Sequence, residues 1–487
     1  MAHAPDRPGI EPFLGDDFLL TTDVARELFH GTAAALPIVD VHSHLPPADI
    51  AGDRVWSSLT ELWLDDDHYK WKAMRLAGFD EQLVTGDADP WDKFAAWAAT
   101  VPRAIGNPLY VWTHLELRRV FGIDLPLHPG TAREIYEEAN RQLPQWSAQR
   151  LLAHFRVAAV ATTDDPADDL GRHTAHRSDA AAITAMIPTF RPDAAHRLLD
   201  DPVAWNEWAD RLGAATGADV DDLETLISAL SISFGRCAAL GGRASDHGLA
   251  RLPDLPRDPV RADLVVRAAR RGIAASDDER DLVLLEVVAL AARLAHADDS
   301  VLQLHLGPLR NVSPRPAAAV GRDVGADVMG DERQANGLAR FLGDLERDGV
   351  LPRTVLYNLN PADNALFATM GGAFSRAGVE SLVQWGPPWW FNDHEQGMRR
   401  QLEDLAQIGQ LAGFIGMLTD SRSILSMTRH ELFRRVACAF LGDEVAAGRY
   451  PADLTYLAEL TRALCIHNAV RFFGFPPAWA EPRAARA

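Results

Sequence analysis

The stretch IVDVHSHLPP, residues 38–47, joins a short apolar run to two histidines one residue apart. Alternate side chains of a β-strand lie on the same face of a sheet, so the rings of His42 and His44 would point the same way. Neutral imidazoles are common ligands of divalent metals. The stretch therefore predicts a strand whose end carries a pair of metal ligands.

Apolar runs of this kind recur along the chain, separated by longer stretches in which apolar residues have helical spacing. The eight runs begin at Pro37, Val157, Ala182, Gly241, Val301, Thr354, Ser381 and Phe414. The fourth, GGRASDHG, is a weak strand by composition. Alternating strands and helices predict parallel βαβ units, and eight such units can close into a barrel. The sequence therefore predicts an α/β fold, a distorted (β/α)8 TIM-type barrel that spans residues 1–487 as one unit.

Nearly every run ends in side chains that can take part in chemistry, namely HSH, TTDD, FRPD, SDH, HLGPLRN and TDSR. In such barrels the active site lies at the C-terminal ends of the strands. We therefore expect these endings to face one pocket.

The intervals between the runs are uneven, and the longest separates the first run from the second. Apolar residues recur there at helical spacing, which predicts a mainly helical insertion over about residues 50–155, after the first strand. A second helical stretch is expected over roughly residues 194–240. The Pro/Ala/Arg-rich residues 476–487 are predicted to form a frayed tail.

The charge balance limits the partners that the protein could have. Asp and Glu total 68 against 48 Lys and Arg, a net charge of −20, and no Lys/Arg block interrupts this excess. Such a composition argues against nucleic acid and anionic membranes as partners. Three scattered cysteines do not suit a disulfide framework, and neither a secretory signal nor a bilayer-spanning segment is recognisable. We therefore expect a cytoplasmic protein.

Asp420 in MLTDSR is the best candidate for a third metal ligand. It ends the last run, which a closed barrel places beside the first, and a carboxylate would complete a minimal site with one position open. His305 in LQLHLG is a possible fourth ligand or proton-transfer group. Two other interpretations stay open, because an HxH pair can arise by chance and Asp420 could instead cap a helix in SRSILSMTRHELFRR. The position of both motifs at opposite ends of the eight-run pattern favours the metal site.

Other strand-end residues have both a structural and a functional interpretation. Arg191 in FRPD and Arg422 in TDSR could be ion-paired structural arginines, or they could bind a substrate carboxylate through two parallel hydrogen bonds. SDHG could lie in the pocket or in a turn. Trp389 in PPWWFND could pack in the core, or it could contact the C–H face of a sugar. The pair His68–Tyr69 in DHYKW lies in the expected insertion, where packing is the ordinary role.

Nine ordered motifs resemble those of the uronate isomerases, also called glucuronate isomerases, an outlying branch of the amidohydrolase superfamily. They are DVHSHLPP, DHYKWKAMR, TVPRAIGNPLYVWTHLEL, TTDDP, PTFRPD, SDHG, LHLGPLRN, WWFND and GMLTDSRSILSMTRHELFRR, and they extend over nearly the whole chain. The resemblance implies an amidohydrolase-like barrel that isomerises hexuronates reversibly in hexuronate catabolism. The reactions would be D-glucuronate to D-fructuronate and D-galacturonate to D-tagaturonate. The resemblance also implies a possible homo-oligomer.

The resemblance implies roles for individual residues. One divalent metal, commonly Zn²⁺ in this family, would be held by His42, His44 and Asp420. The reacting end of the substrate would be lined by His68, Tyr69, His305, Asp420 and Arg422, and the substrate would also be bound by Arg191, Arg422, His68 and Trp389. The family usually has Cys between the two histidines, where this chain has Ser43, whose side chain is expected to point away from the metal. The NVS after Arg310 departs from a more Asn-rich family stretch, so the contacts of that loop stay open.

Isomerisation moves a proton from C2 to C1 while O1 and O2 exchange oxidation level. It therefore requires one base near both carbons and a group that stabilises an enediolate oxygen. A metal with Arg422 could supply the second, and Asp420, Tyr69 or His305 could supply the first. A metal-bridged hydride shift would need no base. A metal-dependent hydrolase of the same barrel type, with metal-bound water as its nucleophile, and a non-catalytic carbohydrate-binding protein are the other function classes.

Overall fold

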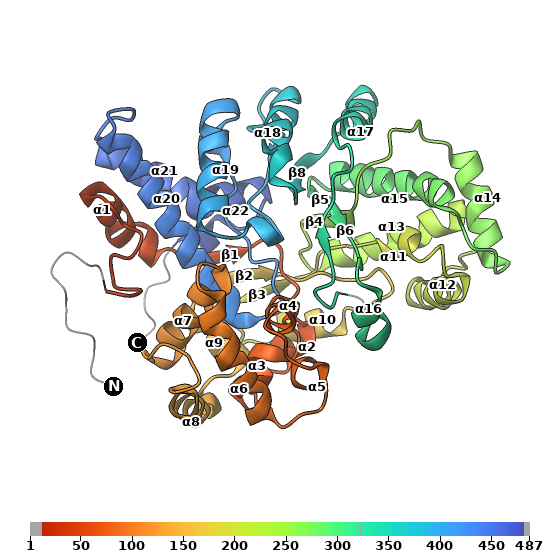
Figure 1. Cartoon of the computed structure of the whole chain (residues 1–487). Coiled ribbons are helices and arrows are strands. Elements are labelled where there is room, and N and C mark those ends of the chain that lie inside the picture. The colour runs from red at the N-terminus through yellow and green to blue at the C-terminus, as the bar shows by residue number, and fades with distance from the viewer. Residues whose placement is uncertain (1–11, 322, 482–487) are drawn as a thin grey trace.

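The computed structural model describes residues 12–321 and 323–481 and shows a mixed α/β protein with parallel sheets (Figure 1). The first sheet contains β1 (Ile38–Asp40), β2 (Val157–Ala161) and β3 (Ala185–Ile187), in that order, and its strands are all parallel. All side chains of β1 and β2 are buried. This burial is expected for a parallel sheet whose two faces are covered.

The second sheet contains β4 (Ala244–Leu249), β5 (Val301–Leu306), β8 (Arg353–Asn358) and β9 (Val383–Trp385), again in that order and parallel. A short antiparallel pair, β6 (Pro308–Leu309) and β7 (Val328–Met329), lies outside it. β4 is completely buried although ASDHGL is a polar sequence. Asp246 has partners on neighbouring elements, His305 and Arg191, whereas the hydroxyl of Ser245 and both ring nitrogens of His247 are buried without a hydrogen bond to any described residue.

Hydrogen bonds connect the edges of the two sheets to other segments. Phe190 forms parallel bridges with Asp164, which follows β2, and with Ser245 in β4. At the other edge of the second sheet, the backbone N–H of Ile415 donates to Oε1 of Gln384 in β9, at 3.1 Å. The segment that contains Ile415 therefore lies beside β9.

The strand predicted from residue 414 is absent, since residues 414–421 have no regular secondary structure. Gly416 has φ 81° and Asp420 has φ 45°, and this left-handed conformation interrupts a strand. The segment nevertheless ends beside β1, because the N–H of Asp420 donates to the carbonyl of His42 at 3.1 Å. The expected neighbourhood of the last run and the first is therefore present without the expected strand.

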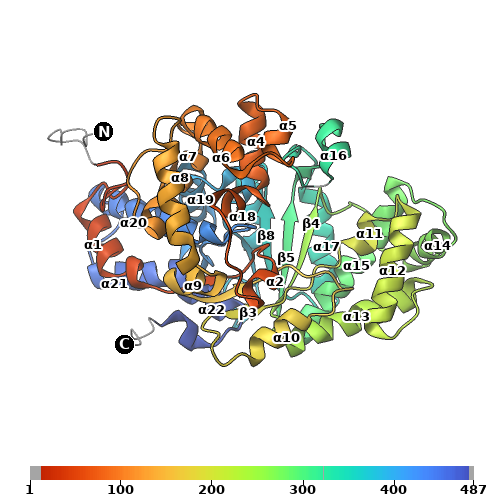
Figure 2. The same cartoon turned by 90° about the horizontal axis from the view of Figure 1, so that it is seen from below.

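The regular secondary structure between β1 and β2 is helical apart from one isolated bridge. Its helices are α2 (Pro47–Ala51), α3 (Leu59–Leu64), α4 (His68–Leu76), α5 (Glu81–Val84), α6 (Pro90–Thr100), α7 (Pro108–Phe121), α8 (Ala132–Gln142) and α9 (Ala148–His154). They gather at the bottom of Figure 1, and α4, α5, α6 and α7 lie at the top of Figure 2. The start of α4 is fixed by its N-cap Asp67, whose carboxylate accepts hydrogen bonds from the N–H groups of Tyr69 (3.0 Å) and Lys70 (3.2 Å). This cap fixes the backbone from which His68 and Tyr69 project.

The second expected helical stretch is confirmed by α11 (Ala194–Arg197), α12 (Pro202–Thr216) and α13 (Leu223–Ala239). The remaining α-helices are α1 (Asp23–Gly31), α10 (Gly171–Ser178), α14 (Pro259–Arg270), α15 (Asp277–Ala297), α16 (Pro314–Val320), α17 (Ala335–Arg347), α18 (Asn364–Ala373), α19 (Glu395–Ile408), α20 (Thr428–Ala446), α21 (Leu454–Arg462) and α22 (Asn468–Phe472). Buried side chains of the sheets and of most helices form one continuous hydrophobic core. None of the described helices is both long enough and apolar enough to span a membrane.

The prediction of a frayed tail is wrong for the part of it that the structure describes. Residues Pro477–Ala480 form the short helix η9. The ring of Trp479 lies 5.3 Å from that of Phe475, and Ala480 is buried. These apolar contacts order the segment. Residues 482–487 lie outside the described part of the chain.

Candidate active site and metal centre

A cavity of about 260 Å³ brings together all the residues that the sequence singled out as catalytic, substrate-binding or metal-ligating. It is lined by His42, His44, His68, Tyr69, Arg191, His305, Trp389, Asp420 and Arg422. The endings TTDD, FRPD and HLGPLRN also reach it, as expected, through Thr163, Asp164, Asp165, Asp193 and Arg310. The other lining residues, for which the sequence indicated no place in the pocket, are Ala194, Arg197, Asp323 and Trp390.

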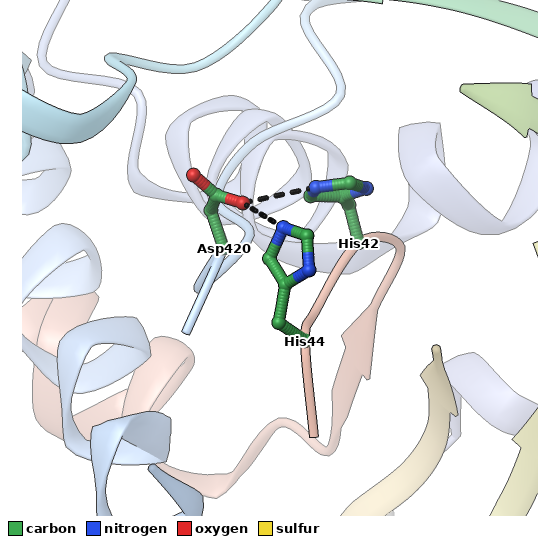
Figure 3. Close-up of side chains that lie close together, drawn as sticks. All are labelled: His42, His44 and Asp420. Atoms are coloured by element: carbon green, nitrogen blue, oxygen red, sulfur yellow. Dashed lines mark hydrogen bonds and ion pairs between the residues drawn. The ribbon is translucent and has the colours of Figure 1, made fainter. Parts of the chain in front are cut away.

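Two histidines and a carboxylate that line this cavity point toward one another (Figure 3). The carboxylate Oδ1 of Asp420 lies 2.9 Å from Nε2 of His42 and 3.1 Å from Nε2 of His44. The backbone of His44 is also bonded to the segment that carries Asp420, because its N–H donates to the carbonyl of Ser421 at 3.0 Å. Ser43 points away from this group, and its buried hydroxyl donates to the carbonyl of Ala161 at 2.8 Å.

Asp420 does not cap the helix that follows it. α20 begins eight residues later, at Thr428, with Met427 as its N-cap residue. Its second carboxylate oxygen, Oδ2, instead accepts a hydrogen bond from the indole N–H of Trp389. Trp389 therefore orients the carboxylate so that Oδ1 faces the two histidines, a role that the sequence did not indicate.

The three donor groups fit one divalent metal ion. Ligands bound at about 2.0–2.2 Å around a tetrahedral ion lie roughly 3.4 Å from each other, which is close to the separations found between Asp420 and the two histidines. The other ring nitrogen of His42, Nδ1, is buried without a hydrogen bond to any described residue, and it lies 3.8 Å from Oδ2 of Asp246. Metal-binding histidines usually direct their second nitrogen at such a carboxylate. The set of two imidazoles and one carboxylate is typical of zinc.

The protonation states of Asp420 and His44 suit metal binding. Burial would raise the pKa of Asp420, but hydrogen bonds and charge from His42 and His44 hold that pKa well below its usual value. Burial lowers the pKa of His44 to about 4. At His42, burial alone would lower the pKa, but the charges of Asp246 and Asp420 outweigh it and raise the pKa. At neutral pH the site therefore holds an ionised carboxylate and a neutral His44, both of which are competent ligands.

His305 lies beside this triad and is held by a second carboxylate. Its Nδ1 is 2.6 Å from Oδ1 of Asp246, and its ring stacks on that of Tyr357 with centroids 4.1 Å apart. Its ring centroid lies 4.6 Å from that of His42. Burial lowers the pKa of His305, although Asp246 opposes the effect. A neutral His305 is therefore favoured at neutral pH.

His68 and Tyr69 enter the cavity from the start of α4. Their rings lie 4.7 Å apart, and the ring of Trp390 packs edge-on against both. Burial raises the pKa of Tyr69 well above its usual value, and the nearby guanidinium of Arg429 only partly opposes this. Tyr69 is therefore a hydrogen-bond donor at neutral pH, which removes the phenolate from the list of candidate bases.

The two predicted carboxylate-binding arginines are held differently. Arg191 is ion-paired at 3.1 Å with both Asp193 and Asp246, and its side chain is 14% exposed. Arg422 pairs with Asp323 at 3.3 Å, and its side chain is 31% exposed. Arg422 is therefore the more accessible cation for an anionic substrate.

Three further charged residues, Arg310, Arg197 and Asp323, line the cavity, and only the first could be predicted from the sequence. Arg310 ends the HLGPLRN run, a position that the strand-end rule selects, and its guanidinium lies 3.2 Å from Asp323. Arg197 lies in α11 and Asp323 lies in a loop, so neither follows a predicted strand. No local pattern pointed to these two residues.

The SDHG motif occupies neither of the places that the sequence offered for it. Asp246 and His247 lie within β4, completely buried, and neither lines the cavity or a turn. Asp246 instead lies behind the cavity wall, in contact with Arg191 and His305.

Known proteins resemble this chain over nearly its whole length. Residues 10–473 match the family model described as glucuronate isomerase. The uronate isomerase of Marinomonas sp. (strain MWYL1) is 43% identical over 95% of this chain and 99% of its own length. The crystal structure of a uronate isomerase from Thermotoga maritima has a TM-score of 0.88 at 35% identity, over 95% of this chain and 99% of that chain. The glucuronate isomerase from Caulobacter crescentus has a TM-score of 0.86 at 25% identity, over 97% and 99% of the two chains. The chain therefore belongs to the glucuronate isomerase family and is an aldose–ketose isomerase.

Proposed function

We propose that this protein interconverts D-glucuronate and D-fructuronate, and D-galacturonate and D-tagaturonate, with one divalent metal held by His42, His44 and Asp420. The observation that carries the proposal is the convergence of these three donor groups in one cavity that also contains Arg191 and Arg422. A metal site and cationic side chains in the same cavity suit a substrate with a reacting carbonyl at one end and a carboxylate at the other.

We further propose that the two parallel sheets belong to one distorted (β/α)8 barrel of the amidohydrolase type. The bridges of Phe190 support this closure at one junction, and the hydrogen bond from Ile415 to Gln384 supports it at another. The hydrogen bond from Asp420 to His42 supports the third junction. In this arrangement the irregular segment 414–421 takes the place of the eighth strand.

The bound metal is proposed to be Zn²⁺, because two imidazoles and a carboxylate suit it and leave a coordination position for substrate. When bound, it supplies electrostatic stabilisation of negative charge on a substrate oxygen. Arg422 lines the same cavity and adds a fixed positive charge. The charge that develops on O1 and O2 during isomerisation is thus met by preorganised groups.

Proton transfer between C2 and C1 needs a single base that is unprotonated before the reaction. The ionised Asp420 and the neutral His305 meet that condition, whereas the raised pKa of Tyr69 does not. We infer that Asp420 carries the proton, with the Tyr69 hydroxyl as a hydrogen-bond donor to the substrate. A base shared between two carbons returns the same proton to the neighbouring carbon unless solvent exchanges it.

Isomerisation in heavy water tests this proton transfer. We expect solvent deuterium at C1 of D-fructuronate formed from D-glucuronate, because the carboxylate of Asp420 is 15% exposed and can exchange its proton with water during at least some turnovers. The measurement is the mass and NMR spectrum of the ketose at low conversion. Ketose that contains no deuterium at C1 at any conversion would favour the hydride shift.

The activity itself is tested by incubating the purified protein with D-glucuronate and measuring ketose formation. Activity should disappear after dialysis against a chelator and return when Zn²⁺ is added back. A hydrolase would instead consume an ester or amide substrate and leave D-glucuronate unchanged, and a binding protein would form no product.

The metal site is tested by His44→Ala with Ser43→Ala as its matched control. His44→Ala removes one of three ligands, and we expect the purified protein to lose most of its bound metal while its circular dichroism spectrum stays native. Ser43→Ala changes the residue between the two histidines, but that side chain faces Ala161, so metal content should stay within about twofold of wild type. Elemental analysis of the three proteins decides the matter, and full metal occupancy in His44→Ala would exclude the proposed ligand set.

A further inference from the structure

Asp246 is a completely buried carboxylate that the proposed reaction does not yet use. We propose that Asp246 is a positioning residue whose two carboxylate oxygens fix His305 and Arg191 in the orientations that the reaction requires. The proposal relies on the isomerase function only for its effect on turnover, and it makes a separate prediction about the ring of His305.

Each oxygen of Asp246 contacts a different functional group. Oδ1 lies 2.6 Å from Nδ1 of His305, and Oδ2 lies 3.1 Å from Nη1 of Arg191. A carboxylate beside a guanidinium accepts hydrogen bonds and has none to donate, so the proton of the His305 ring is on Nδ1. The other nitrogen, Nε2, has no hydrogen-bond partner among the described residues. Because His305 lines the cavity, this nitrogen, although buried, is the one left for a contact with substrate.

β4, which carries Asp246, leaves room for the side chain of Arg191 at Gly248. A Cβ atom on Gly248, two residues after Asp246, would collide with Nη2 of Arg191. The N–H of Gly248 donates to Oδ2 of Asp193 at 3.0 Å, and that oxygen lies 3.1 Å from Nε of Arg191. Arg191 is therefore held at two positions, by Asp193 at Nε and by Asp246 at Nη1. His305 shares only the second of these carboxylates.

The ring nitrogens and carboxylate of His42, Asp246 and His305 also lie close enough to be considered as a second metal site. Both oxygens of Asp246 already have partners, however, because Oδ2 lies 3.1 Å from the guanidinium of Arg191 and Oδ1 lies 2.6 Å from Nδ1 of His305. The hydrogen bond between Asp246 and His305 accounts for the short distance between them without an ion. We therefore assign these residues to a positioning network and expect one metal ion per chain.

Asp246→Asn is the informative substitution because the amide has the shape of the carboxylate but only one accepting oxygen. Its NH₂ group must face either Nδ1–H of His305 or the guanidinium of Arg191, both of which are donors. Either the guanidinium of Arg191 must move, or the ring of His305 must move or transfer its proton from Nδ1 to Nε2. Asp193→Asn is the matched control, since Asp193 contacts Arg191 but not His305.

At saturating Zn²⁺, with metal content measured, Asp246→Asn should lower kcat for D-glucuronate about 10- to 100-fold, the range typical of removing such an outer partner, and should also raise KM. Asp193→Asn should raise KM and lower kcat less than Asp246→Asn does, because it leaves the contact between Asp246 and His305 in place. Equal changes of kcat and KM in the two variants would overturn the proposal, as would two bound metal ions per wild-type chain.

The tautomer of His305 can be observed without any turnover, and it decides the case even if Asp246→Asn does not fold. Long-range ¹H–¹⁵N spectra of zinc-loaded protein labelled with ¹⁵N-histidine distinguish Nδ1–H from Nε2–H rings, and the signal lost in His305→Gln identifies the ring. The proposal expects Nδ1–H in wild type. A proton on Nε2 of His305 in wild type would overturn it while leaving the isomerase function intact.

Discussion

Asp420→Asn should lower kcat for D-glucuronate at least about a thousandfold. A general base contributes roughly a hundredfold to ten-thousandfold, and Asn supplies no base. The amide also lacks the negative charge that faces two imidazole nitrogens at 2.9 and 3.1 Å, so the metal is held more weakly. The measurement is kcat at saturating Zn²⁺, with the metal content of the same sample determined so that the two losses are separated.

Trp389→Phe is the matched control for this substitution. It removes the indole N–H that donates to Oδ2 of Asp420 but keeps the carboxylate and an aromatic ring. We expect a loss of up to about tenfold, the cost of one hydrogen bond that orients a reacting group. If Asp420→Asn lost no more than Trp389→Phe, another residue would carry the proton, and His305 would be the next candidate.

The sequence revealed those parts of the fold that depend on local pattern. Seven of the eight runs contain strands, because a buried parallel strand is usually marked by its own composition and by the polar residues that end it. β4 is the exception, since its sequence ASDHGL is polar. The eighth run contains no strand, because left-handed backbone at Gly416 and Asp420 depends on packing that composition does not record. The prediction of a frayed tail likewise depends on residue types alone, which do not reveal that Trp479 packs on Phe475.

The residues of the candidate site could likewise be predicted only where a local pattern marks them. His42 and His44 were predicted from alternation along one strand, although β1 ends at Asp40 and both histidines lie in the irregular segment that follows it. Asp420 was predicted from the order of the runs together with a resemblance to a known family. The partners of these residues are not apparent. Asp246 contacts His305, and Trp389 contacts Asp420. Each contact joins residues far apart in the chain and depends on side-chain packing. Arg197 and Asp323 line the cavity from a helix and a loop, where strand-end reasoning does not apply.

The arginines of the cavity should make the enzyme selective for hexuronates over neutral hexoses. A protein with a net charge of −20 repels an anionic substrate at long range, and only fixed cations near the binding site reverse this locally. Arg422 is the main candidate, because it is about twice as exposed as Arg191 and is paired with one carboxylate, Asp323, rather than two. Arg191 should act chiefly by its fixed position between Asp193 and Asp246.

Truncation of Arg422 to Met should therefore lower the ratio of kcat/KM for D-glucuronate over D-glucose by about 30-fold to several thousand-fold. This range corresponds to about 2–5 kcal/mol for removing one partner of a hydrogen-bonded charge pair that the bound substrate would shield from solvent. Arg422→Lys should restore only part of the ratio, because an ammonium group cannot form the two parallel hydrogen bonds of a guanidinium. Arg191→Lys should lower the ratio less than Arg422→Met does, since Arg422 remains the exposed cation.

The measurement is the pair of kcat/KM values for each protein at one ionic strength. Equal use of glucose and glucuronate by wild type, or an unchanged ratio in Arg422→Met, would show that the substrate carboxylate binds elsewhere.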